Sequence, residues 1–88
     1  MKKTYLISYD LAEDGDYDAL YEVIKSYGFW AHITESLWAI VTDQSARQIR
    51  DILEVYLPEG SRLFIVNSGI EAAWRNVICR SAWLKKNL

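Results

Sequence analysis

The stretch TYLISYD, residues 4–10, decides the fold that this sequence predicts. Its residues alternate as in a strand, with one face formed by Tyr5, Ile7 and Tyr9. The strand closes on Asp10, and an acidic loop follows it. A carboxylate at the end of an apolar strand is positioned either to hold a divalent metal or to be solvated, so Asp10 is the first candidate functional residue.

A helix and two paired strands are predicted next along the chain. Apolar residues at helical spacing predict a helix over residues 17–27, with Asp16 as its N-cap and Gly28 as its stop. Residues 29–33 and 35–42 then predict two strands joined by a tight connection.

The second helix has the clearest local signal in the chain. Ser45 followed by Gln48 fits a capping box, in which each side chain satisfies a backbone N–H of the other residue. The apolar stripe expected to face the core consists of Ile49, Ile52, Leu53 and Tyr56. A break at residues 58–60 leads into a predicted fourth strand over residues 62–67, which is apolar on both faces.

These elements predict an α+β fold of the ferredoxin-like βαββαβ type, an antiparallel sheet with both helices on one face. We expect one domain over residues 1–88, with its core in residues 1–67 and a C-terminal extension in residues 68–88. The helix-free face contains many apolar residues, and such a patch usually marks a partner surface. We expect the tail to cover part of it through Trp74, Ile78, Trp83 and Leu84, and a second protomer to cover the rest, which predicts a homodimer.

Composition and charge narrow the classes of protein. Cys79 is the single cysteine, so no intrachain disulfide can form and a reducing compartment is expected. No basic-then-apolar leader opens the chain, and no apolar run approaches the roughly 18 residues that span a bilayer. We therefore expect a cytoplasmic protein without membrane attachment.

The net charge of −2 does not favour tight binding of nucleic acid, because phosphate neutralisation dominates such binding. Residues 1–43 hold three lysines against eight acidic residues, whereas residues 44–88 hold seven basic residues against four acidic ones. The second half can therefore form a local basic surface from its arginines, Arg47, Arg50, Arg62, Arg75 and Arg80.

Several short motifs resemble known families. The Tyr9-Asp10 pair, Tyr27-Gly28 and the ESLWA stretch at residues 35–39 resemble the CRISPR-associated Cas-two family and its VapD-like relatives. Four segments also resemble short bacterial chains labelled SinR family: Ser26-Tyr27-Gly28, Glu35-Ser36-Leu37-Trp38, Ala72-Ala73-Trp74 and Trp83-Leu84-Lys85. The SinR label brings no established chemistry with it.

The Cas-two resemblance implies a homodimer in which the first-strand Asp10 residues face each other. In some members of that family this residue binds a divalent metal for phosphodiester cleavage, so Asp10 is the implied catalytic residue and the implied ligand of Mg²⁺ or Mn²⁺, with RNA or DNA as substrate. Other members are structural and join integrase subunits. The family often places arginines shortly after the Asp, whereas this chain has residues 12–16, AEDGD, at that place.

The alternative function is non-catalytic: a protein-interaction module, or a toxin–antitoxin or regulatory component, that uses the apolar sheet face while Asp10 is structural. Other site chemistries are disfavoured. The acidic loop does not reproduce EF-hand spacing, and His32 and Cys79 are too few for a zinc site. The Arg/Lys-Gly-Phe motif of RNA-recognition domains is absent, so we expect the aromatic residues to fill the core and interfaces.

Overall fold

The computed structural model describes residues 1–12, 17–69 and 71–88. A four-stranded antiparallel sheet in the order β2-β3-β1-β4 is formed by β1 (Lys3–Asp10), β2 (Trp30–Thr34), β3 (Leu37–Thr42) and β4 (Arg62–Asn67). The helical elements are α1 (Tyr17–Lys25), α2 (Ala46–Leu53), a single 3₁₀ turn η1 (Glu54–Tyr56) and α3 (Ser81–Asn87). The α+β class is as predicted, and the arrangement is compatible with a ferredoxin-like fold.

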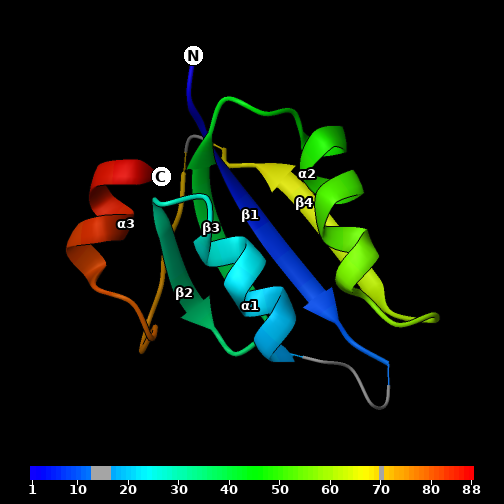
Figure 1. Ribbon diagram of the computed structural model, residues 1–88. Coiled ribbons are helices and arrows are strands. Elements are labelled where there is room, and N and C mark those ends of the chain that lie inside the picture. The colour runs from blue at the N-terminus through cyan, green and yellow to red at the C-terminus, as the bar shows by residue number, and fades with distance from the viewer. Residues whose placement is uncertain (13–16, 70) are drawn as a thin grey trace.

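Helices α1 and α2 cover one face of the sheet (Figure 1). Strand β1 is central, and its Ile7 lies between Trp38 of β3 and Ile65 of β4. The predicted inward face of β1 is confirmed, because its Tyr5, Ile7 and Tyr9 are buried. They pack with the buried helix residues Leu20, Ile24, Ile49 and Leu53, which form the main core.

A polar contact lies inside this core. The Tyr9 hydroxyl accepts a hydrogen bond from Trp38 Nε1 at 2.9 Å and donates one to the Glu35 carbonyl at 3.2 Å. Burial raises the pKa of Tyr9 above its ordinary value. Tyr9 and Trp38 therefore lie among apolar side chains with their polar atoms satisfied.

The capping box of α2 is confirmed: Ser45 Oγ accepts from the Gln48 N–H at 3.1 Å, and Gln48 Oε1 accepts from the Ser45 N–H at 2.8 Å. The predicted stripe is half right, since Ile49 and Leu53 are fully buried. Ile52 and Tyr56 are exposed. The α-helix ends at Leu53 and tightens into η1, so the 3.6-residue period no longer carries Tyr56 to the core side.

Glycines end the first helix and shape the turn after the second. Gly28 has φ +89° and donates its N–H to the Lys25 carbonyl, so it stops the helix as predicted. The helix itself ends two residues before the predicted boundary, and the predicted N-cap Asp16 lies outside the described residues. Gly60, at φ +88°, is the corresponding residue of the turn into β4.

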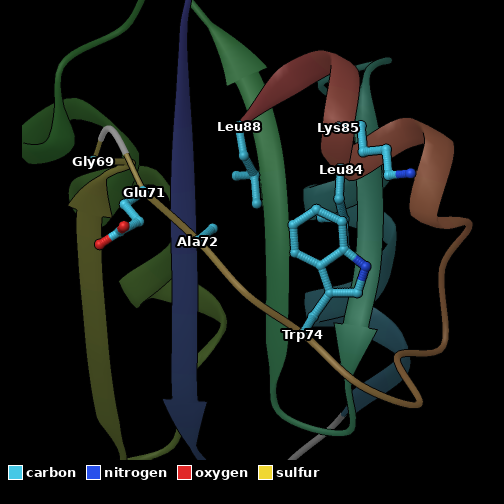
Figure 2. A pocket seen from close by; sticks show the side chains of 7 residues that line it. All are labelled: Gly69, Glu71, Ala72, Trp74, Leu84, Lys85 and Leu88. Carbon is cyan, nitrogen blue, oxygen red and sulfur yellow. The ribbon is translucent and has the colours of Figure 1, made fainter.

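The C-terminal extension crosses the other face of the sheet. After β4 the Ser68 N–H donates to the Thr4 carbonyl at 2.8 Å, and the chain then passes over β1 and β3 toward β2, where α3 lies (Figure 2). Leu84 of α3 is only 1% exposed and packs on Ala31, Ile33 and Ala39 of the sheet. The tail therefore covers part of the helix-free face, as expected.

The tail residue Ile78 differs from the expectation, because its side chain is 62% exposed. Its backbone N–H instead donates to the Ile33 carbonyl at 2.8 Å, on the outer edge of β2. The tail is thus attached to this edge by its backbone, while the Ile78 side chain does not contribute to the core. Trp74 and Trp83 are half-buried and pack beside Leu84.

Candidate functional site

The tail crosses β1 but leaves Ser8 of β1 and Phe64 and Val66 of β4 exposed on the helix-free face. Leu6 and Ser8 of β1 lie directly opposite Val66 and Phe64 of β4, so their side chains share one face. Phe64 is 63% exposed and Val66 is 40% exposed. We call these four residues the open strip. Because these exposed apolar side chains lie next to one another on a sheet face, the strip is a candidate interaction surface.

Asp10 lies at one end of the open strip, in register with Arg62. The two side chains form an ion pair of 2.9 Å between Asp10 Oδ2 and an Arg62 guanidinium nitrogen. Both remain largely solvated, with Asp10 67% exposed, so the pair contributes little to stability. Together with Ser8 and Phe64 they line a shallow hollow of about 260 Å³.

A second hollow, of about 170 Å³, lies where the tail crosses the sheet (Figure 2). Its apolar wall is formed by Trp74, Leu84 and Leu88, while the Lys85 side chain extends away from it. Trp74 is further fixed by a 3.2 Å hydrogen bond from its Nε1 to Ser81 Oγ. This hollow lies between the crossing segment of the tail and α3, and no buried polar group in the described residues lacks a partner there.

The predicted metal ligand, Asp10, belongs to no cluster of three or more acidic, histidine or cysteine side chains in the described part of the chain. No group of three such side chains occurs among the described residues. The Asp10 carboxylate is also already paired with Arg62, whose positive charge occupies the place of a cation. Among the described residues of one chain, Asp10 thus has an arginine partner and no cluster of metal ligands around it. The acidic residues 13–16 of the neighbouring loop lie outside the described residues.

His32 and Cys79, which are far apart in the sequence, line one hollow at the edge of β2. The His32 ring is stacked on Trp38 at 4.1 Å between centroids, with 9° between the planes. Burial raises the pKa of the Cys79 thiol, which is the opposite of what an activated nucleophile needs. The two residues are therefore brought near each other as packing groups.

The ion pair between Asp10 and Arg62 was not predicted from the sequence. Both residues stand at strand ends, which was visible, but their contact depends on the register of β1 against β4. The sequence also did not reveal that the sheet's exposed aromatic side chains lie at its two edge strands, with Phe29 just before β2, Trp30 in β2 and Phe64 in β4.

Comparison of the chain with protein-family models, curated proteins and solved structures gives no match. Among the helices of the described residues, none is both long and apolar enough to cross a membrane.

Proposed function

We propose that this protein is a homodimeric interaction module in which two copies meet through the open strip. The observation that carries the proposal is the exposure of Phe64 and Val66 on a sheet face that the tail covers only in part. Leu6 lies at the boundary, since it packs against the tail cluster on one side and adjoins Val66 on the other. A partner bound to the open strip would thus bury the apolar part of the helix-free face that the tail leaves exposed.

A second copy of this chain is the occupant that the charges favour. Asp10 and Arg62 lie side by side at one end of the strip, so the surface carries both signs of charge. A surface of that kind is complementary to itself after a two-fold rotation, as an isologous dimer contact requires. In the proposed dimer the two-fold axis lies near the Asp10 end of the strip, so that the two Asp10–Arg62 pairs meet at the contact.

The area for a stable dimer extends beyond the four strip residues, because a specific interface buries about 1,000 Å² or more in total. Next to Phe64, the outer edge of β4 adjoins a hollow of about 310 Å³ that Arg47 and Arg50 of α2 also line. This edge continues the open strip around the side of the sheet and supplies the additional surface.

The fold proposed for the module is the ferredoxin-like βαββαβ arrangement with α3 added after it. The chain order of the elements and the sheet order β2-β3-β1-β4 support this assignment. The motif resemblance to the Cas-two and VapD-like group supports the same fold and the same dimeric state.

Sedimentation equilibrium of the wild type and of Phe64→Asp tests the dimer. We expect a dimer at micromolar concentrations for the wild type and a monomer for Phe64→Asp, because the variant buries an unpaired charge in the contact. Val55→Asp is the matched control, since Val55 is 75% exposed on η1, away from the strip. A wild type that sediments as a monomer would refute the proposal.

A second candidate function is metal-dependent cleavage of RNA or DNA through Asp10, with Mg²⁺ or Mn²⁺. The observation that favours it is the exposed position of Asp10 at the end of the strip, where the proposed dimer places two such carboxylates. Oxygen ligands from both protomers suit these ions better than one carboxylate does.

Nuclease assays separate the two candidates. RNA and double-stranded DNA are incubated with each metal and with the wild type, Asp10→Ala or Phe64→Asp. Cleavage that both variants abolish would support the metal-dependent nuclease. Dimer formation without cleavage would support the non-catalytic interaction module. Cleavage that survives in Asp10→Ala would exclude Asp10 as the catalytic residue.

A further inference from the structure

Exposed aromatic side chains gather at the start of β2, the edge strand opposite β4. Phe29 is 60% exposed and Trp30 is 37% exposed. Phe29 lies in the bend just before β2, and the two rings line different hollows. Each has an ammonium group near its ring, since Lys2 Nζ lies 5.4 Å from the Phe29 centroid and Lys25 Nζ lies 5.3 Å from that of Trp30.

Two hollows flank this edge, and both are lined by Arg80 and Trp83. One, of about 290 Å³, is also lined by Trp30 and Ile78, and the other, of about 400 Å³, by Phe29 and Lys86. We call the surface formed by these six residues the β2-edge groove. Among the described residues, no acidic side chain lines either hollow.

The cations of the groove are free to meet a ligand. Within the described residues, the side chains of Arg80 and Lys86 form no hydrogen bond or ion pair. Arg80 precedes α3, its backbone carbonyl accepts a hydrogen bond from the Trp83 N–H, and the residue is exposed. The groove thus combines flat apolar rings with unpaired positive charge, although the whole chain is acidic.

We propose that the β2-edge groove binds single-stranded nucleic acid. Exposed bases stack on aromatic rings, and a positively charged groove follows the phosphates, whereas a duplex keeps its base faces hidden. At least one exposed ring lines each hollow, and Arg80 lines both, so it can meet a phosphate that connects the two stacked bases. An acidic peptide would use the cations but has no comparable use for Phe29 and Trp30.

The groove is different from the base-stacking platform of RNA-recognition domains. On the helix-free face the central strands β1 and β3 carry Leu6, Ser8 and Ala39, none of which is aromatic. The missing RNA-recognition motif therefore excludes base stacking on the central strands. It does not exclude base stacking at the edge of β2.

Fluorescence anisotropy at low salt tests the proposal with a labelled oligothymidylate of about ten nucleotides, a length within the site sizes of such binders. A duplex of the same length and a labelled oligoglutamate serve as the comparison ligands. We expect the oligothymidylate to bind more tightly than both. Equal or tighter binding of oligoglutamate would overturn the proposal in favour of an acidic protein partner, and no binding of the oligothymidylate would overturn it outright.

Variants locate the site. Phe29→Ala is expected to weaken binding by about fivefold or more, because each stacked base contributes strongly. Tyr56→Ala, at an exposed aromatic residue on η1, is the matched control and should change nothing. For Arg80→Gln, the slope of log K against log salt concentration should become smaller in magnitude by about 0.7, as expected for one lost phosphate contact to a single strand. Arg47→Gln, on α2, should leave this slope unchanged.

The groove and the proposed dimer contact lie at opposite edges of the sheet, so their tests fail independently. Phe29→Ala should remain dimeric by sedimentation while losing oligonucleotide affinity, and circular dichroism verifies its fold. Phe64→Asp should bind oligothymidylate with the same affinity per groove. Any loss of apparent affinity should not exceed the effect of having one groove per particle in place of two. Unchanged affinity in a folded Phe29→Ala would overturn the proposal whatever the state of the dimer.

Discussion

Tyr9 brings a hydroxyl into the middle of an apolar core, and that hydroxyl is held from two sides. It accepts from Trp38 Nε1 and donates to the Glu35 carbonyl at the β2–β3 connection. The same ring packs near Tyr17 and Tyr21 of α1, with centroids 6.2 and 6.3 Å away. A single residue therefore links the central strand, the first helix and a distant turn.

We expect Tyr9→Phe to lower the free energy of unfolding by about 1–3 kcal/mol, because the buried Trp38 N–H loses its acceptor. Urea denaturation monitored by circular dichroism measures the change. Tyr17→Phe is the control, since Tyr17 is exposed and its hydroxyl is not part of this contact. A loss no larger than that of the control would show that the Tyr9 hydroxyl is dispensable.

The buried tyrosines also predict how stability depends on pH. Burial raises the pKa values of both Tyr9 and Tyr27 in the folded state. Stability from these groups is therefore complete below pH about 10, the ordinary tyrosine pKa, and is lost as the pH rises above it, because the unfolded chain releases the protons first.

We expect the free energy of unfolding to fall above pH 10 by at most about 1.4 kcal/mol per pH unit for each such tyrosine. Urea titrations across this range measure the slope, and Tyr9→Phe should have a shallower one. Identical slopes in the wild type and the variant would contradict the assignment to Tyr9.

At the scale of the elements, the tail depends on one small helix. Leu84 is its buried anchor, and polar contacts hold the two ends of the tail: Ser68 N–H to the Thr4 carbonyl, and Thr4 Oγ1 to the Asn87 carbonyl at 2.6 Å. The helix has only seven residues, too few to be stable alone, so its structure rests on packing against the sheet.

Leu84→Ala should therefore release α3 and lower stability by about 2–5 kcal/mol, the usual effect of truncating a buried leucine. Amide exchange of the Ile78 N–H, which pairs with the Ile33 carbonyl, should accelerate at the same time. Ile78→Ala is the control, because that side chain is exposed and its removal should cost less than about 0.5 kcal/mol. Unchanged amide exchange in Leu84→Ala would mean that the tail is held by other contacts.

The elements that could be predicted from the sequence are those whose signals are local. The capping box of Ser45 and the stop at Gly28 involve residues within one helical turn, and both are confirmed. The exposure of the Ile78 side chain could not be predicted, because the sequence does not show that the backbone of Ile78, and not its side chain, contacts β2. The same reason separates the two halves of the candidate site: Asp10 was visible as a strand-end carboxylate, whereas its contact with Arg62 required the β1–β4 register.

At the scale of the whole molecule, the helix-free face is divided between a half covered by the tail and the open strip. If two copies meet on the strip, folding and association are linked, and the melting temperature must rise with protein concentration. We expect this rise for the wild type and not for Phe64→Asp. Differential scanning calorimetry over a roughly hundredfold range of concentration measures it. A melting temperature independent of concentration in both proteins would argue against the dimer.

The central position of β1 has a consequence for synthesis. This strand leaves the ribosome before the rest of the sheet, yet the partner for one of its edges, β4, begins only at Arg62. Until then the nascent chain presents an apolar strand with an unpaired edge, the kind of segment that chaperones bind and that can aggregate while it stays exposed.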